Sequence, residues 1–422
     1  MSGIAYAIIT LATSTLWGVI SGWLLYFYLP PTGTPLVPVA LYSLVMLISR
    51  IVNIVITLPI GYLSDRTHTR WGRRMPYVVG GALFVPFLFV LLWKPPHMGE
   101  SMTNLIYIAV LMVVFNVVYE IHQIPYEAML PDLFTEDKQR INVSAWRSAF
   151  QFLGAIVVGA AGPLIEKTGY ANTVLIFAVG SAPFLFLPMF FLREKNTPPR
   201  DTTAQTSLME SIRLTLSNKA FQIFTLAWAL SWIASTFMME TLPYIVTEVC
   251  RLNEADTIYF YLPAVIVSLL CFPLVTWLAK RFGKLRIFSG SLLLCAIIQP
   301  GLMLIGDWIP IPLMAQGIAW VLMVATALSA ARILPTAIAA DITDLDEKIT
   351  GLRREGSFYA FWGLLDQLAS GVGSACLPLF LLLGRSKTDP QGPLGIRLLG
   401  LGGGVLLFLG FLIFRKYPHP DS

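Results

Sequence analysis

Apolar residues along this chain gather in long runs that are separated by short polar connections. Twelve runs reach the length of about 20 residues that an α-helix needs to cross the hydrocarbon core of a bilayer. They cover about residues 5–28, 37–63, 75–93, 103–130, 141–165, 172–192, 219–247, 257–279, 286–305, 311–340, 356–384 and 394–414. This pattern predicts an all-α membrane protein with twelve transmembrane helices.

The composition agrees with this interpretation, because the chain has few charged residues. Of its 422 residues, 56% are hydrophobic and 13% are charged, and the mean hydropathy is +0.71. A soluble domain carries about 25% charged residues, so lipid must cover the apolar surplus. The net charge of +5 is modest, and most positive residues lie in the connections. We therefore expect membrane lipids, and no nucleic acid, as partners.

The chain shows no pattern typical of a metal site, a cofactor site or an enzyme. Its four cysteines are scattered without a Cys-x-x-Cys pair, so they predict neither a metal site nor a disulfide framework. A nucleophile–base set and a phosphate-binding loop are also missing from the sequence. We expect no metal, no cofactor and no enzymatic activity.

A basic connection recurs in the two halves of the chain. The first, residues 61–76, contains four arginines and one aspartate, and a weaker copy occupies residues 277–286. Gly72 and Gly283 hold matching positions, half a chain length apart. Such a duplication in an apolar chain predicts a transporter with two pseudo-symmetric six-helix bundles. The two bundles and their linker are residues 1–192, 219–422 and 193–218.

Lysine and arginine are distributed unevenly between alternate connections. If the N-terminus is cytoplasmic, the cytoplasmic segments contain 20 of the 29 Lys and Arg residues, and the outer loops contain six. The remaining three lie inside predicted helices. Because cytoplasmic loops carry an excess of positive residues, we expect both termini in the cytoplasm.

Ionisable side chains inside a membrane span are costly, so each is a candidate for function. They are Arg50, Glu120, His122, Glu127, Arg147, Glu240, Arg332 and Asp366. As a set, they indicate a polar cavity between the halves. The alternative is that opposite charges pair as structural locks. Such pairs could be Glu120 with Arg147 and Asp366 with Arg332.

Glu120 and Glu240 are the best placed carboxylates for proton coupling, one in each half. A proton-coupled carrier needs a buried carboxylate that can take up and release a proton near neutral pH. Gln123 follows Glu120 by three residues and shares its helix face. His122 points to nearly the opposite side of that helix.

Aromatic side chains could stack on a sugar ring. Trp17, Trp146, Trp232 and Trp362 lie away from the ends of predicted helices, and Tyr359 is a further candidate. The alternative is packing or anchoring at the membrane interface, which is common for membrane aromatics.

The loop between the second and third helices predicts more than orientation. Its spaced residues are Gly61, Asp65, Arg66, Arg70, Gly72, Arg73 and Arg74. We interpret them as a charge lock that holds neighbouring helices together in the outward-facing state and releases when the halves rock. The alternative is orientation alone, through the positive-inside rule.

This loop, the twelve helices and the two halves resemble the major facilitator superfamily. Residues 65–76, 119–131 and 341–359 are more particularly similar to the glycoside–pentoside–hexuronide cation symporters, the family of the melibiose permease. The resemblance spans both halves and implies a secondary transporter with alternating access. It also implies that Arg353, Arg354 and Glu355, before helix eleven, belong to the gating region.

The chain departs from that family at charged positions. Asn53 and Thr57 replace the two acidic cation ligands of helix two, Gln123 replaces an acidic sugar ligand, and Gln367 replaces a lysine of helix eleven. Arg147 fits the family's arginine near the sugar. The resemblance thus favours a proton over sodium as any coupling ion. The coupling or charge-pair candidates are Asn53, Thr57, Glu120, Glu240, Arg332 and Asp366. The substrate-binding candidates are Trp17, Glu120, Gln123, Arg147, Trp232, Tyr359, Trp362 and Gln367.

We therefore expect a monomeric secondary transporter in a bacterial-type inner membrane, with a sugar or glycoside as its small-molecule substrate. Because the resemblance extends more weakly to lysophospholipid carriers, a carrier of lysolipids or other amphiphiles is the alternative. Uncoupled facilitation also stays open. A membrane receptor or scaffold without transport is disfavoured by the duplicated loop and the buried charges.

Overall fold

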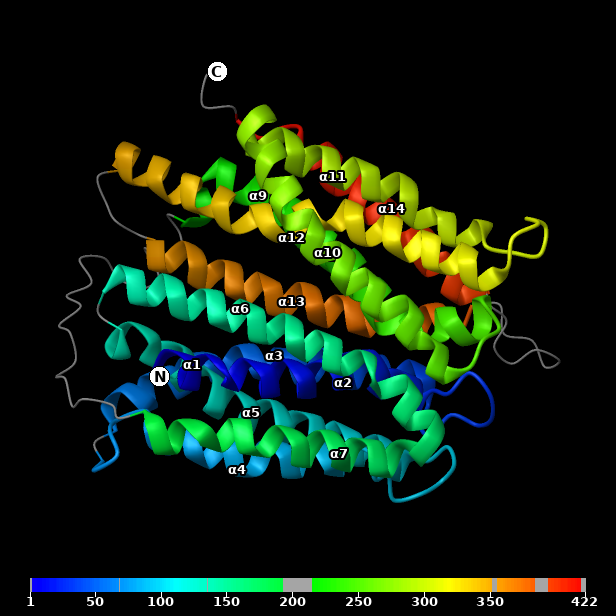
Figure 1. Ribbon diagram of the computed structural model, residues 1–422, viewed down its shortest axis with the longest axis horizontal. Coiled ribbons are helices and arrows are strands. Elements are labelled where there is room, and N and C mark those ends of the chain that lie inside the picture. Colours follow the sequence, from blue (N-terminus) through cyan, green and yellow to red (C-terminus); the bar gives the residue numbers. More distant parts are fainter. Residues whose placement is uncertain are drawn as a thin grey trace. The chain divides into compact units, whose positions relative to one another are not determined.

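The computed structural model describes residues 2–67, 69–134, 136–192, 215–350, 355–383 and 394–418, which form helices and no strands (Figure 1). The helices of the first half are α1 (Ser2–Ala7), α2 (Ile9–Tyr28), α3 (Val39–Arg66), α4 (Met75–Leu91), α5 (Met102–Leu133), α6 (Asp137–Gly159) and α7 (Ala161–Phe191). Those of the second half are α9 (Lys219–Tyr244), α10 (Thr257–Phe282), α11 (Lys284–Ile298), α12 (Leu313–Thr350), α13 (Glu355–Leu381) and α14 (Leu394–Phe414). The short helices are η1 (Ile245–Val249), η2 (Glu254–Asp256) and η3 (Gln299–Leu304).

The predicted membrane spans are present as helices. Among the described residues, 11 helices are long and apolar enough to cross a membrane, and α4 is a shorter apolar helix. Together they account for the twelve predicted spans. Within α7 the helical geometry breaks at Gly169, where φ is 77°, a value that glycine adopts readily. This break falls between the predicted end of the fifth span and the predicted start of the sixth.

The described helices form two compact units. The first unit contains α1 to α7 together with residues Asn253–Tyr261, and the second contains the remaining helices. In the first unit α2 packs against α6 and α7, while α5 packs against α3 and α4. In the second, α9 packs against α13 and α14, while α11 packs against α12 and α14. The boundaries at 192 and 219 stay predictions, because residues 193–214 lie outside the described chain.

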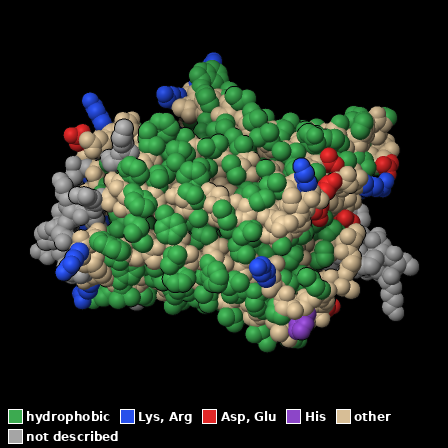
Figure 2. Space-filling model, turned by 60° about the horizontal axis from the view of Figure 1, so that its bottom comes forward, with side chains coloured by type: hydrophobic (Ala, Val, Ile, Leu, Met, Phe, Trp, Pro, Cys, Tyr) green, Lys and Arg blue, Asp and Glu red, His purple; other side chains and the backbone are tan. Residues whose placement is uncertain are grey.

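Apolar side chains lie on the outer surfaces of the helices as well as in the contacts between helices. In Figure 2 hydrophobic groups occupy most of the visible face, and charged groups lie mainly toward its two ends. Phe87 of α4 is 59% exposed and Leu270 of α10 is 70% exposed. Large apolar side chains exposed over so wide an area require lipid rather than water around them, so this is a multi-pass integral membrane protein.

A glycine with a positive φ occurs at the matching position of the duplicated loop in both halves. Gly72 has a φ of 108° and Gly283 a φ of 89°. Residues with a side chain avoid this region, whereas glycine enters it without steric cost. Gly283 directly precedes α11, whereas Arg73 and Arg74 stand between Gly72 and α4. The sequence repeat therefore corresponds to a repeated glycine conformation in the structure.

Arg74 joins three helices of the first unit at one end, which we call the charged end. Its Nε and Nη2 donate to Asp65 Oδ1, at 3.0 and 2.6 Å, and its Nη1 donates to Asp132 Oδ2 at 2.7 Å. The same Nη1 donates to the backbone oxygen of Ala128. Arg73 Nη2 also donates to Asp132 Oδ2, at 2.6 Å. The cluster ties the end of α3, the start of α4 and the end of α5 together.

The second unit repeats this bridge in simpler form. Lys284, directly after Gly283, lies 2.5 Å from Asp341 Oδ2 on α12. Thus a basic residue at the start of the third helix meets an acidic residue of the fourth helix in both halves. Neither acidic partner, Asp132 or Asp341, was among the predicted lock residues, since each lies about 60 residues from its partner in sequence.

The other predicted loop residues have more local contacts. The guanidinium of Arg66 lies over the ring of Tyr62, with Cζ 4.2 Å from its centroid, while Arg70 is exposed. Gly61 accepts a hydrogen bond from Ser64 through its backbone oxygen. Arg353, Arg354 and the side chain of Glu355 lie outside the described residues, so their role stays a prediction.

Asp132→Asn should lower the melting temperature of the protein in detergent by several degrees. The asparagine removes the carboxylate shared by two arginines, and losing one partner of a largely buried ion pair costs about 3–5 kcal/mol at most. The control is Glu136→Gln, which removes the same charge at an exposed position. Equal melting temperatures for the two variants would show that the cluster does not hold the helices together.

Candidate functional site

Polar side chains form a stripe along one face of α5 inside the first unit. The members are Asn116, Glu120, Gln123 and Glu127. Their spacing of four, three and four residues places them on the same side of the helix. Asn116 is 1% exposed, and the sequence analysis did not single it out.

Glu120 is held by α3. Asn53 Nδ2 donates to Glu120 Oε1 at 2.9 Å, and Asn53 is almost fully buried. Thr57, the second coupling candidate on α3, donates its hydroxyl to the backbone oxygen of Asn53 at 2.8 Å. Of the two residues at the family's cation-ligand positions, the structure therefore brings Asn53 into contact with the carboxylate.

Arg147 pairs with Glu127, and the predicted pair of Arg147 with Glu120 is wrong. Arg147 Nη2 on α6 donates to Glu127 Oε1, which also accepts from Gln123 Nε2 at 2.8 Å. The physical reason is the pitch of α5. Glu127 lies seven residues beyond Glu120, about 10 Å along the helix axis. Arg147 meets Glu127, and Glu120 faces α3.

A pair of tyrosines lies beneath Arg147. The Arg147 guanidinium Cζ is 5.4 Å from the ring centroid of Tyr126. Tyr126 and Tyr6 stack at 4.5 Å, and each hydroxyl donates to the backbone oxygen of the other residue, at 2.7 and 2.9 Å. These contacts fix the platform under the guanidinium, a cation–π arrangement.

Trp17 of α2 also belongs to this region. The Arg50 guanidinium Cζ lies 4.8 Å from the Trp17 ring centroid, and the rings of Trp17 and Tyr119 are 5.4 Å apart. The structure therefore places Trp17, a predicted substrate ligand, beside Tyr119, which directly precedes Glu120 in the sequence. Trp146, by contrast, is 47% exposed, and its ring lies 5.9 Å from that of Phe150 on its own helix, tilted by 30°.

Several buried polar atoms of this stripe and of its neighbours on α3 and α6 have no hydrogen-bond partner among the described residues. They are Asn53 Oδ1, Asn116 Oδ1 and Nδ2, Gln123 Oε1 and Arg147 Nε. Leaving such an atom unsatisfied costs about 1–3 kcal/mol. Water, an ion or the hydroxyl groups of a ligand would satisfy them. A concentration of these atoms on α3, α5 and α6 therefore marks a candidate binding site.

His122 has a packing role on the other side of α5, as its helix position predicts. It is fully buried, and its Nδ1 lies 2.8 Å from the backbone oxygen of Val78 on α4. A Cβ atom built on Gly81 would lie 2.4 Å from His122 Cβ. The glycine therefore permits α4 and α5 to approach closely.

The second unit contains an aromatic cluster between α9 and α13. Trp228 and Trp232 stack at 5.5 Å, and Trp362 meets Trp228 edge-on at 5.3 Å. Tyr359 lies 5.9 Å from Trp362. Three predicted substrate residues, Trp232, Tyr359 and Trp362, thus belong to one cluster, which Trp228 connects.

Polar groups accompany these rings. Trp232 Nε1 donates to Ser370 Oγ at 2.7 Å, and Ser374 Oγ donates to Glu240 Oε1 at 2.6 Å. Trp362 Nε1 and Gln367 Oε1 are buried without a hydrogen-bond partner among the described residues. The two serines of α13 are not among the predicted site residues, although each follows the previous polar residue of that helix face by four positions.

The remaining charged candidates of the second unit are Arg332 and Asp366. Arg332 Nη2 lies 3.4 Å from Met239 Sδ, beside Glu240 in sequence. The pairing of Arg332 with Asp366 stays a prediction. Within the described residues no group of three or more His, Cys, Asp or Glu side chains could hold a metal ion.

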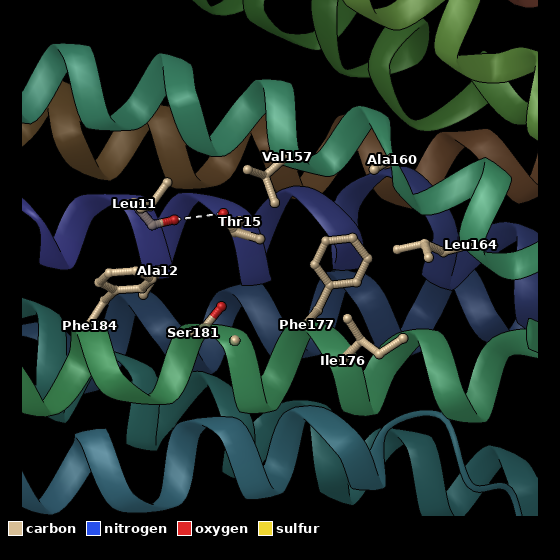
Figure 3. A pocket seen from close by; sticks show the side chains of 11 residues that line it. Leu11, Ala12, Thr15, Val157, Ala160, Leu164, Ile176, Phe177, Ser181 and Phe184 are labelled. Carbon is tan, nitrogen blue, oxygen red and sulfur yellow. Dashed lines mark hydrogen bonds between the residues drawn. The ribbon is translucent and has the colours of Figure 1, made fainter.

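An apolar cavity of about 240 Å³ lies apart from the polar stripe, between α2, α6 and α7 (Figure 3). Phe177 and Phe184 line it from α7. Thr15 and Ser181 are the two polar side chains among its lining residues, and the Thr15 hydroxyl donates to Leu11 O at 2.7 Å. Such a lining suits a hydrocarbon group better than a sugar.

The relatives of this chain are transporters. A relative, the isoprimeverose transporter of Lactiplantibacillus pentosus, is 26% identical and aligns with 90% of this chain and 79% of its own length. The sodium-dependent lysophosphatidylcholine symporter 1-B of Danio rerio is 22% identical, over 90% of this chain and 79% of that protein.

The fold also matches solved transporter structures. A crystal structure of the nucleoside transporter NupG, determined for a mutant of that protein, superimposes with a TM-score of 0.72 at 13% identity, covering 99% of this chain and all of that one. This likeness shows the fold. The family model described as MFS/sugar transport protein matches residues 5–419. The chain therefore belongs to this transporter family and has the major facilitator fold, as the sequence predicts.

Proposed function

We propose that the protein moves a sugar or glycoside across the membrane by alternating access. The observation that carries this proposal is the set of buried, unpartnered amide and guanidinium atoms on α3, α5 and α6. A second set, on α13, lies beside a tryptophan cluster. Amide groups donate and accept hydrogen bonds, and the guanidinium donates several in fixed directions. Sugar hydroxyls do both, and the faces of sugar rings stack on aromatic rings.

The chemistry of the relatives supports this substrate class. One relative is named as an isoprimeverose transporter, and another, of Escherichia coli, as a glucuronide carrier protein homolog. On this proposal Gln123 and Arg147 bind hydroxyl groups from the first unit. Trp362 and Gln367 are the matching candidates of the second unit.

For coupling we propose a proton rather than sodium. Glu120 is a membrane-depth carboxylate that accepts a hydrogen bond from the neutral Asn53 of α3 and also interacts electrostatically with Arg50 of that helix. Neutral Asn53 and Thr57 give a monovalent cation weaker electrostatic anchoring than two carboxylates would. Glu240, which accepts a hydrogen bond from Ser374, is the matching candidate in the second unit.

We further propose that the protein works as a monomer in a bacterial-type inner membrane, with both termini in the cytoplasm. The distribution of Lys and Arg supports this orientation. The charged end of the first unit, with Asp65, Arg74 and Asp132, is then cytoplasmic.

A carrier of lysolipids or other amphiphiles is the second candidate function. The observation in its favour is the apolar cavity between α2, α6 and α7, which could accept a hydrocarbon chain. The lysophosphatidylcholine symporter of Danio rerio aligns over the same share of this chain as the isoprimeverose transporter does. An acyl chain, however, has no polar groups that could form hydrogen bonds with the polar stripe.

Uptake into proteoliposomes distinguishes these functions. Purified protein should carry isoprimeverose or another glycoside of a panel, and an imposed proton gradient should drive accumulation more than a sodium gradient does. Lysophosphatidylcholine uptake without any sugar uptake would establish the second candidate instead. Sodium-driven uptake that Asn53→Ala and Thr57→Ala abolish would overturn the proposed coupling.

Glu120→Gln should abolish proton-driven accumulation of the transported glycoside while leaving exchange of that glycoside across the membrane. Glutamine can accept the hydrogen bond from Asn53 but cannot carry a proton. The control is the exposed Glu136→Gln, which should accumulate the glycoside like the parent. If Glu120→Gln accumulates it as the parent does, the coupling carboxylate is elsewhere.

Arg147→Lys should weaken binding of that glycoside at least tenfold, about 1.4 kcal/mol. Lysine keeps the charge near Glu127 but loses the planar set of donors. Calorimetric titration of the purified protein measures the affinity. If both Arg147→Lys and Arg147→Ala bind normally and melt at lower temperature, the ion pair with Glu127 has a structural role alone.

A further inference from the structure

The apolar cavity of about 240 Å³ between α2, α6 and α7 lies within the first unit, to which all three helices belong (Figure 3). The part of α7 that lines it consists of Ile176, Phe177, Gly180, Ser181 and Phe184. Residues three and four positions apart lie on the same side of a helix, so these five form one face. The cavity is therefore a slot along that face of α7, and α2 and α6 are its other walls.

Helix packing does not account for Gly180. A Cβ atom built on it would meet no neighbouring heavy atom within 4 Å. Where α2 and α6 touch, by contrast, a Cβ on Gly154 would lie 2.1 Å from Ser14 Oγ, and one on Gly18 would lie 2.6 Å from Val158 Cγ2. Those two glycines permit close contact between helices, whereas Gly180 leaves space open beside them.

The lining of this space suits hydrocarbon. Thr15 and Ser181 supply its hydroxyl groups, and the Thr15 hydroxyl donates to Leu11 O at 2.7 Å. The other lining residues have no polar side-chain atom. A buried water molecule needs two to four polar partners, and an engineered apolar cavity of about 150 Å³ stays dry and binds benzene. This larger cavity therefore has room for more carbon atoms than a benzene ring has.

The slot is open toward the surface that lipid covers. Ile176 is 49% exposed and Val157 is 38% exposed, whereas Phe177 and Ser181 are buried. Both α6 and α7 are long and apolar enough to cross the membrane, so their exposed side chains face acyl chains. Among the described residues that line the slot none is charged. The hydrocarbon part of a lipid can therefore enter it, and the headgroup cannot.

The length of the slot fits a chain that runs parallel to the helices. From Ile176 to Phe184 the lining extends about 12 Å along the axis of α7, close to the depth of one leaflet, about 15 Å. A lipid chain is in hydrocarbon before it enters, so the hydrophobic effect does not drive entry. The gain is van der Waals contact with walls that would otherwise face a void. Occupancy should therefore depend on the free volume of the slot.

We propose that this cavity is a binding site for one acyl chain of a membrane phospholipid, which stays bound and is not transported. The headgroup remains at the membrane surface, and the chain fills the space that Gly180 leaves open. The site lies apart from the polar stripe of α5, to which we assign the glycoside. The lipid is then a packing component of the first unit, and the cavity has a role in a protein whose cargo is a sugar.

Labelling from a photoreactive lipid tests the site. The protein is reconstituted in vesicles of phosphatidylethanolamine and phosphatidylglycerol with a trace of phosphatidylcholine that carries a diazirine in the middle of one acyl chain. After illumination, mass spectrometry locates the label. The measured quantity is the ratio of label on the buried Phe177 and Ser181 to label on Val179, which is 63% exposed on the same helix. A bound chain should label the buried residues at least as strongly as Val179.

Filling the slot should remove the label from the buried residues. Gly180→Leu should lower the ratio about fivefold, and Gly180→Ala, which adds one methyl group, about twofold. The control is Gly80→Leu, at a glycine of α4 whose added Cβ also meets no neighbouring atom within 4 Å; it should keep the parent ratio. Melting curves check that each variant is folded, and the smaller change to alanine decides the question if Gly180→Leu does not fold.

Three results would overturn the proposal. The first is a parent protein in which Phe177 and Ser181 take far less label than Val179, because no chain would then enter the slot. The second is a ratio that both substitutions of Gly180 leave unchanged. The third is uptake of lysophosphatidylcholine by the parent that Gly180→Leu abolishes, because the chain would then be cargo. Labelling needs no transported substrate, so a failure of glycoside uptake does not affect this inference.

Discussion

A polar group inside the hydrocarbon core of a bilayer has no water to bind, and the structure of this protein depends on that constraint. The backbone meets it by forming helices, which satisfy their own N–H and C=O groups. Most side-chain hydroxyls of the spans meet it locally, as Thr225 does by donating to the backbone oxygen of Phe221 at 2.6 Å. Against this background the unpartnered atoms of Asn116, Gln123 and Gln367 are exceptions that a transported ligand can explain.

The same constraint decides how much the sequence could predict. Long apolar runs fix the spans, and helix periodicity alone placed Gln123 and Glu120 on one face and His122 on the other. Pairing between helices is different, because it depends on how far each side chain lies along its axis. The sequence therefore offered Glu120 as the partner of Arg147, whereas the structure shows Glu127. Asp132 was missed for the same reason, since its arginine partners are 58 and 59 residues away.

The first unit has a different kind of attachment at each of its ends. At the charged end, the nearly buried Arg74 joins Asp65 and Asp132 through several charged hydrogen bonds. At the opposite end, residues Asn253–Tyr261 pack on α7 at Gly162, with Glu166 and Glu254 among the polar contacts. Attraction between opposite charges acts over longer distances than a steric fit does. All members of the charged network belong to the first unit, so the network holds α3, α4 and α5 together within that unit.

The central claim is that the polar stripe of α5 binds a glycoside, and calorimetric titration of isoprimeverose and related glycosides tests it most directly. The account predicts that the parent binds at least one of them and that Gln123→Leu loses this binding. Gln139→Leu, the same change at an exposed position near the charged end, should bind like the parent. Equal binding by Gln123→Leu and the parent would contradict the claim, because the stripe would then have no part in holding the substrate.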